Sequence, residues 1–326
     1  MKKHTKLRYS FLRIITGSDL SSRRIPLMSI QSDQPGPTIW LTACIHGDEL
    51  GGTVTIQELF KRLRSNLLCG TVNAFPLANP FGFENVSRNI SVSREDLNRA
   101  FPGDPKGSLA QRIAHMIIEK ICAKKPDLVI DLHNDWRKSI PYAVVDCDKN
   151  DNPESAVNKT LDAAFATGLP VVRETDDITG TLAGSLLDRD IASLTLELGE
   201  SFVINEKNIL HGVESIWNIL SWYGMTQQVE SLQIPPYAAQ IKGQILQYSQ
   251  EPLSSTSGII RFLKPQGSFV KKKQAIARIY NAFGRLQQTI YAGSDALILG
   301  QSDSSLSFPG FPIMAFGVLP PGQALK

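Results

Sequence analysis

Between residues 38 and 224, short apolar runs alternate with longer segments whose apolar residues recur at helical spacing. The apolar runs predict strands at 38–45, 70–80, 126–135, 141–147 and 191–201. The helical spacing predicts helices at 49–68, 108–125, 154–168 and 205–224. Continuous apolar runs are typical of strands that are buried on both faces of a sheet. This alternation predicts an α/β fold with a mixed central sheet and flanking helices.

The sequence changes character after the last of these helices. Residues 233–239 contain two consecutive prolines, and beyond them short β-rich runs are broken by Gly, Pro and Ser. We therefore expect an α/β domain at 1–232, a linker at 233–239 and a small all-β domain at 240–326.

Composition narrows the class of protein. Of the 326 residues, 42% are hydrophobic and 20% charged, as in soluble globular proteins. A net charge of +3 gives no field that favours nucleic acid or membrane partners. The basic start of the chain is interrupted by Arg13 before any signal-peptide core forms, and no apolar run reaches the roughly 18 residues of a membrane span. Scattered cysteines without a C-x-x-C motif predict free thiols in a cytoplasmic protein; they are Cys44, Cys69, Cys122 and Cys147.

Two predicted strands end in residues that can bind a metal ion. His46 and Glu49 follow the strand at 38–45, and His133 ends the strand at 126–135. Open α/β sheets bind ligands at the carboxyl ends of their strands. Two histidines and one carboxylate form a known ligand set for catalytic zinc, which leaves the fourth position for water. The sequence therefore predicts one Zn²⁺ per chain at these three residues.

The same H-x-x-E spacing occurs a second time, at His211 and Glu214. That pair lies inside a regular amphipathic helix, where residues three apart are ordinary neighbours. His115 also lies in the middle of a predicted helix. We expect these residues to be structural and not metal ligands.

Three carboxylates are candidates for supporting roles. Asp131 precedes His133 by two positions and is expected to orient that imidazole. Glu197 is an ionisable residue in an apolar run, which is costly unless the residue is paired or functional. We expect Glu197 to transfer protons, with a buried ion pair as the alternative. Glu200 lies beyond a glycine and is the less favoured candidate.

The segment at 80–106 is expected to be a long functional loop, because it is irregular and dense in polar residues. It contains four residues suited to binding a carboxylate or a developing oxyanion, together with one acid: Arg88, Arg94, Asn98, Arg99 and Asp96. Each arginine could equally be a solvated loop residue.

Four motifs occur in the order HGDE, NPFGFENVSRNISVSREDLNRAFPG, DLHN and TLELG. Together they resemble the succinylglutamate desuccinylase/aspartoacylase family of zinc-dependent hydrolases, which are relatives of the zinc carboxypeptidases. The resemblance covers roughly residues 25 to 225. It implies a zinc carboxypeptidase-like α/β fold with zinc held by His46, Glu49 and His133.

The resemblance also implies roles for other residues. Glu197 corresponds to the family's general base and acid. Asn98 and Arg99 match the doublet that holds the substrate carboxylate. Arg88 matches the arginine that polarises the scissile carbonyl, with Arg94 as the alternative.

Two departures from the family pattern are informative. Aspartoacylases carry a carboxylate-binding arginine shortly before the catalytic glutamate, whereas here only Arg189 is near and its position does not match. The run SGIIRFLKPQGSFVKKKQAIARI is similar to a biotinyl/lipoyl-type barrel-sandwich, but the following YNAFGRLQQ lacks the acceptor lysine of carrier domains. We expect the C-terminal domain to be a structural or access-shaping module.

These features predict a zinc-dependent amidohydrolase that removes an acyl group from a small N-acyl amino acid or related acid. The alternative within the same chemistry is a zinc carboxypeptidase acting on short peptides. A metal-free binding protein with the same fold is less favoured, because it would not need to keep the ligand set and Glu197. The expected partner is a small N-acylated substrate, and the sequence allows a homo-oligomer without requiring one.

Overall fold

The computed structural model describes residues 5–16, 21–146, 152, 155–174, 178–228 and 241–320. The strands that precede residue 228 are β1 (Thr5–Thr16), β2 (Ser22–Ser32), β3 (Thr38–Ala43), β4 (Thr71–Phe75), β5 (Leu128–Asp135), β6 (Lys138–Ser139), β7 (Pro141–Val145), β8 (Val171–Arg173) and β9 (Ser193–Glu200). The helices are α1 (Gly51–Asn66), α2 (Pro80–Glu84), the 3₁₀ helix η1 (Leu97–Arg99), α3 (Leu109–Cys122), α4 (Ala156–Ala166), α5 (Leu182–Leu187) and α6 (Glu206–Trp222). The predicted strands and helices are all present, with ends shifted by a few residues.

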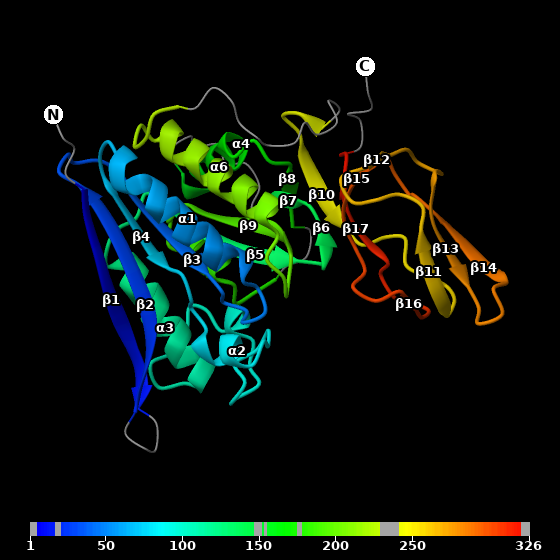
Figure 1. The fold of residues 1–326 in the computed structure, drawn as a ribbon, viewed down its shortest axis with the longest axis horizontal. Coiled ribbons are helices and arrows are strands. Elements are labelled where there is room, and N and C mark those ends of the chain that lie inside the picture. Colours follow the sequence, from blue (N-terminus) through cyan, green and yellow to red (C-terminus); the bar gives the residue numbers. More distant parts are fainter. Residues whose placement is uncertain are drawn as a thin grey trace.

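The central sheet is mixed, as predicted. Its order begins β1-β2-β4-β3-β5-β9-β7-β8. Strands β4, β3, β5 and β9 run parallel, whereas β7 is antiparallel to β9 and β2 is antiparallel to β4. Because β3, β5 and β9 are parallel neighbours, their carboxyl ends meet at one edge of the sheet (Figure 1).

Helices cover both faces of this sheet (Figure 1). Alternate residues of a strand point to opposite faces, so Ile39 and Leu41 pack with α1, α4 and α6 in one apolar cluster. Trp40 and Val129 pack with α3 and α5 in a second cluster on the other face. The apolar faces of the helices therefore bury β3 and β5 on both sides. This packing holds in place the strand ends that carry the candidate ligands.

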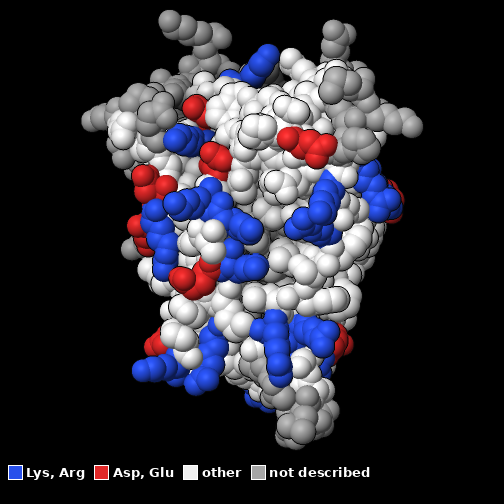
Figure 2. All heavy atoms as spheres, turned by 90° about the vertical axis from the view of Figure 1, so that its left-hand side faces the viewer, with Lys and Arg blue, Asp and Glu red and all other residues white. Residues whose placement is uncertain are grey.

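The long antiparallel hairpin β1–β2 was not predicted. Its strands lie at the edge of the sheet and much of their surface is exposed, so they lack the continuous apolar pattern of the inner strands. Basic side chains gather on the side of the molecule where the hairpin lies (Figure 2). The hairpin itself carries the exposed basic residues Lys6, Arg8, Arg13 and Arg24. None of the described residues that line the cavity discussed below comes from this hairpin.

The segment at 80–106 is irregular, as expected, but contains the short helices α2 and η1. Side-chain caps begin both of them. Asn79 Oδ1 accepts a hydrogen bond of 2.9 Å from the Gly82 amide, and Asp96 Oδ1 accepts one of 2.8 Å from the Asn98 amide. The second cap holds η1 beside the strand ends.

The named elements of the C-terminal part are all strands: β10 (Ile245–Ser249), β11 (Gly258–Phe262), β12 (Phe269–Val270), β13 (Ala275–Tyr280), β14 (Leu286–Tyr291), β15 (Ala296–Gln301), β16 (Leu306–Ser307) and β17 (Met314–Val318). Four of them form a separate antiparallel sheet in the order β14-β13-β11-β16. The others extend the central sheet, because β10 pairs in parallel with β8 and is followed by β17, β15 and β12, while β6 pairs with β15.

The expected all-β character of this part is thus confirmed. The linker at 233–239 lies outside the described residues, so the division into domains at 232 and 240 stays a prediction. Among the described helices, none combines the length and apolarity needed to cross a bilayer.

Candidate active site

The His46–Glu49 turn leads directly from β3 into α1, and α1 starts close to β5. A Cβ added to Gly52 would lie 2.7 Å from the Cβ of Leu132, which is too close for two carbon atoms. Glycine has no Cβ and therefore fits at this position. At the same point the Gly51 amide donates a 3.0 Å hydrogen bond to Asn134 Oδ1. The two glycines after Glu49 therefore let the start of α1 approach the end of β5.

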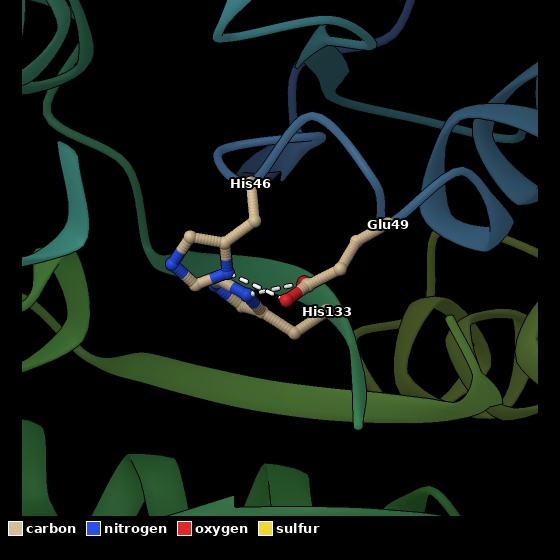
Figure 3. A group of neighbouring side chains, drawn as sticks. All are labelled: His46, Glu49 and His133. Atoms are coloured by element: carbon tan, nitrogen blue, oxygen red, sulfur yellow. Dashed lines mark hydrogen bonds and ion pairs between the residues drawn. The ribbon is translucent and has the colours of Figure 1, made fainter. Parts of the chain in front are cut away.

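This approach brings three predicted residues together (Figure 3). Glu49 Oε1 lies 2.6 Å from His46 Nδ1, and Glu49 Oε2 lies 2.8 Å from His133 Nδ1. One ligand atom from each residue lies within 4.8 Å of the others. The three residues are 2 to 4% exposed. The group could hold a metal ion.

A carboxylate stands behind each histidine. His133 Nε2 lies 2.8 Å from Asp131 Oδ2, and His46 Nε2 lies 3.2 Å from Asp96 Oδ1. Partners of this kind fix the ring orientation and leave the other nitrogen free to bind a metal. Asp131 lies where the sequence placed it. The contact of Asp96 was not predicted, because nothing in the spacing shows which loop acid reaches His46.

The electrostatics of the group fit a cation. Burial alone would raise the pKa of Glu49, but the two histidines hold that pKa below its ordinary value. Burial alone would lower the pKa of His133, but Asp131 and Glu49 raise it well above its ordinary value. When both histidines are neutral, the three residues carry the single negative charge of Glu49, which favours a cation between them. Two imidazoles with a carboxylate are a ligand set that suits zinc.

Glu197 lies on β9, directly beside His133 in the parallel register of β5 and β9. Its Oε2 is buried and has no hydrogen-bond partner among the described residues. Burial, and next the nearby charge of Asp135, raise the pKa of Glu197 well above its ordinary value. Glu200 instead accepts hydrogen bonds from Asn205 and Asn208. The structure therefore places Glu197, and not Glu200, beside the three-residue group.

Sequence reasoning did not identify the pair formed by Asp135 and Tyr142. The Tyr142 hydroxyl donates a 2.6 Å hydrogen bond to Asp135 Oδ2, and both residues line the same cavity as Glu197. Burial raises the pKa of Asp135 to about 7. The one available indication was that Asp135 follows the DLHN motif on the same strand.

The four candidates in the 80–106 segment separate in space. Arg88, Asn98 and Arg99 line the cavity, whereas Arg94 is exposed and is not among the lining residues. The Nε of Arg88 donates a 3.0 Å hydrogen bond to Asp96 Oδ2. Its terminal nitrogen lies 3.7 Å from Glu49 Oε1. Of the two arginines left open by the sequence, only Arg88 thus stands beside the three-residue group.

Other residues considered from the sequence lie elsewhere. The side chain of Arg189 donates a 2.9 Å hydrogen bond to the Ser185 carbonyl and does not line the cavity. His211 is buried within α6, and its neighbour Glu214 forms a 2.7 Å ion pair with Arg62. Neither side chain of this second H-x-x-E pair reaches the cavity.

The cavity has a volume of about 950 Å³ and is lined from three directions. The strand ends and the 80–106 segment contribute the residues described above. The turn at 178–181 and α5 form a second side. The C-terminal part closes a third side with residues that include Tyr248, Gln250 and Leu253. Substrate binding would therefore involve both parts of the chain.

Comparisons with known proteins agree with this arrangement. Residues 35–223 match the family model described as succinylglutamate desuccinylase/aspartoacylase catalytic domain. The chain is 28% identical over 285 residues to the N-alpha-acetyl-L-2,4-diaminobutyric acid deacetylase of Halomonas elongata. The aligned region covers 84% of this chain and 80% of the relative.

Solved structures show the same fold. The ectoine utilization protein EutE (DoeB) of Ruegeria pomeroyi matches with a TM-score of 0.80 at 22% identity, over 96% of this chain and 95% of that one. A metallo-carboxypeptidase of Burkholderia cenocepacia matches less of the chain, with a TM-score of 0.52 at 17% identity over 65% of this chain and 64% of that one.

Proposed function

Because the chain belongs to the succinylglutamate desuccinylase/aspartoacylase family, we propose that it is a zinc-dependent amidohydrolase. Its substrate in this proposal is a small N-acyl amino acid or related acid. The observation that carries the proposal is the convergence of His46, Glu49 and His133 beside Glu197, in the wall of a cavity that Arg88 also lines.

In this proposal His46, Glu49 and His133 hold one Zn²⁺ per chain. When bound, zinc supplies Lewis acidity and lowers the pKa of a water molecule to about 7. Asp131 and Asp96 keep the two imidazoles turned so that each Nδ1 faces Glu49 and is available to a bound metal.

The other residues act on protons, charge and orientation. Glu197 accepts the proton of the attacking water and returns it to the leaving amine, a role that suits a carboxyl group with a raised pKa. The Arg88 guanidinium donates hydrogen bonds to the oxygen of the amide carbonyl as negative charge develops there. Asn98 and Arg99 bind the substrate carboxylate.

The C-terminal wall favours a small substrate over a peptide. Tyr248, Gln250 and Leu253 close the cavity on one side, which restricts the room for a longer chain. The match to the metallo-carboxypeptidase covers only 65% of this chain. The relative from Halomonas elongata is named for a small N-acetylated amino acid, which supports the same substrate class here.

Metal analysis and a substrate panel test the proposal. We expect one zinc per chain and hydrolysis of at least one compound among N-acetyl-L-2,4-diaminobutyrate, N-acetyl-L-aspartate and N-succinyl-L-glutamate. A dipeptide serves as the probe for carboxypeptidase activity. A chelator should abolish turnover and added zinc should restore it. Purified protein without metal, or turnover that survives chelation, would contradict the proposal and favour a binding protein.

Two further predictions stay untested. The free thiols of Cys44, Cys69 and Cys122 agree with the cytoplasmic location predicted from the sequence, which we retain as part of the proposal. The state of assembly stays open to a homo-oligomer.

A further inference from the structure

A short turn at residues 180–182 contacts Asn98 and Arg99, the two residues that we propose bind the substrate carboxylate. The Leu182 amide donates a 2.9 Å hydrogen bond to Asn98 Oδ1. We propose that this turn is a positioning element that sets the orientation of the Asn98 amide and the place of Arg99, and thereby selects substrates with a free carboxylate. This inference rests on the proposed function and adds residues that act through Asn98 and Arg99.

The hydrogen bond determines which end of the Asn98 amide faces Leu182 and which end faces His133. A backbone N–H can only donate, so its partner must be the amide oxygen and not the NH₂ group. Nδ2 is therefore the end turned away from Leu182, and it lies 3.5 Å from Nε2 of His133. A rotated amide would place the Asn98 NH₂ group against the Leu182 N–H, two donors facing each other, and would leave the Leu182 N–H unsatisfied.

Gly180 fixes the distance between the turn and Arg99. Its φ is +77°, and an added Cβ would lie 2.4 Å from the carbonyl oxygen of Arg99. The Phe101 amide also donates a 3.1 Å hydrogen bond to the Gly180 carbonyl. Because only glycine combines this backbone angle with so close an approach, the turn lies directly against the backbone of residues 99–101.

Apolar contacts hold the same two segments together. Leu97 and Phe101 flank the carboxylate-binding pair, and Leu182 and Leu186 belong to α5. All four side chains are buried in one cluster. The apolar contacts bring α5 to η1, and the hydrogen bond from Leu182 then sets the amide of Asn98.

The consequence for binding is a donor of fixed direction. A carboxylate accepts hydrogen bonds from Asn98 Nδ2 and from the Arg99 guanidinium. A carboxamide presents one NH₂ group in place of an acceptor oxygen. An Asn98 side chain free to rotate could turn its own oxygen toward that NH₂ group, whereas one held by Leu182 cannot. The turn therefore increases discrimination between acid and amide.

The test removes one N–H group and leaves the helix in place. Leu182 is the first residue of α5, where its N–H has no partner within the helix and proline is tolerated. The preceding Thr181 has φ −80° and ψ 155°, which is the backbone region that a following proline requires. Leu182→Pro thus removes the donor to Asn98, and Leu182→Ala is the matched control because it loses side-chain packing but keeps the N–H.

Binding to the zinc-free protein gives a measurement that does not depend on turnover. Calorimetry would follow N-acetyl-L-2,4-diaminobutyrate and its carboxamide. We expect Leu182→Pro to weaken binding of the acid about tenfold relative to Leu182→Ala, and not to weaken binding of the carboxamide, because a freed Asn98 can turn its oxygen toward the NH₂ group. In an Asn98→Ala background the two substitutions should become equivalent, since the partner of the N–H is gone.

The outcomes separate this inference from the proposed function. If wild-type protein binds acid and carboxamide equally, the carboxylate site itself is refuted, and the inference with it. If wild-type protein prefers the acid but the Pro and Ala variants bind alike, only the positioning role is refuted. If they still differ in the Asn98→Ala background, the effect of proline does not pass through Asn98, and the inference is likewise overturned.

Discussion

The sequence contains the same H-x-x-E spacing in two regions, and the structure uses them differently. His46 and Glu49 lie in a turn after β3, where His133 from the neighbouring strand completes a three-residue group. His211 and Glu214 lie within α6. Both pairs are buried, so burial alone does not distinguish them.

The difference lies in what faces each pair. Glu214 meets Arg62 from α1 at 2.7 Å, which neutralises its charge within the core. Glu49 meets two histidines, and each histidine meets a further carboxylate. Residues three apart are neighbours in any helix and can also be a pair of metal ligands. His46 and Glu49 differ from the second pair because a neighbouring strand end adds His133, and the three together could hold a metal ion.

The largest expected effect contrasts the two histidine pairs directly. We expect His133→Ala to lose zinc and to lower kcat/KM by more than about 10⁴-fold, since the Lewis acidity of zinc and the water that it acidifies are both lost. His211→Gln, as the matched control, should keep one zinc per chain and near-normal turnover. Metal analysis together with steady-state kinetics measures both. Zinc loss in the His211 variant would show that the second pair contributes to the centre.

The next contrast concerns two buried glutamates. We expect Glu197→Gln to lower kcat by about 10²–10⁴-fold while zinc content stays at one per chain, because only proton transfer is removed. Glu214→Gln is the control and should leave kcat unchanged. An active Glu197→Gln enzyme would assign proton transfer to another group.

The raised pKa of Glu197 also predicts how the free energy of unfolding depends on pH. Burial raises the pKa of Glu197 in the folded protein. The folded state therefore keeps a proton that the unfolded state releases, and stability falls as pH rises from the ordinary carboxyl pKa toward the raised one. We expect metal-free Glu197→Gln protein to be at least as stable as metal-free wild type at pH 7, by denaturant unfolding. A clear loss of stability would mean that the ionised carboxylate is paired.

A smaller effect is expected from the carboxylate behind His133. Asp131→Asn should weaken zinc affinity about 10–100-fold, because the imidazole loses the partner that orients it. Competition with a chelator of known affinity measures this change. Asp127→Asn, which alters the acid just before the opposite end of the same strand, provides the comparison and should leave zinc affinity unchanged.

The smallest effect on the proposed zinc site is expected from a change in the second H-x-x-E pair, His211 and Glu214. Glu214→Gln removes a charge from the ion pair with Arg62 and should lower the free energy of unfolding by about 1–3 kcal/mol. Zinc content should not change. Thermal or denaturant unfolding measures the loss, and an unchanged stability would mean that Arg62 finds equal stabilisation elsewhere, for instance over the ring of Trp217.

Much of the central sheet could be predicted because its inner strands are continuous apolar runs between helical segments. The hairpin β1–β2 could not, since an edge hairpin with much exposed surface lacks that pattern. The continuation of the sheet through β10 was also missed. Strand partners so far apart along the chain are chosen by tertiary packing, and nothing in the local sequence of β8 or β10 identifies the other.

The candidate site divides in the same way. His46, His133 and Glu197 could be named in advance because each follows, ends or interrupts an apolar run, and Glu49 because it follows His46 at a spacing of three in the same turn. Three contacts could not: Asp96 with His46, Tyr142 with Asp135, and Leu182 with Asn98. Each joins segments whose separation in the sequence carries no periodic pattern.

By itself the sequence determined the α/β class, the order of the inner elements and the residue types able to bind zinc, because hydrophobic periodicity and donor chemistry are local properties. Only the tertiary structure decided which loop acid reaches His46, which arginine stands beside the three-residue group, and which end of the Asn98 amide faces Leu182. Those outcomes depend on which strand ends and turns are packed together, and packing is a property of the whole chain.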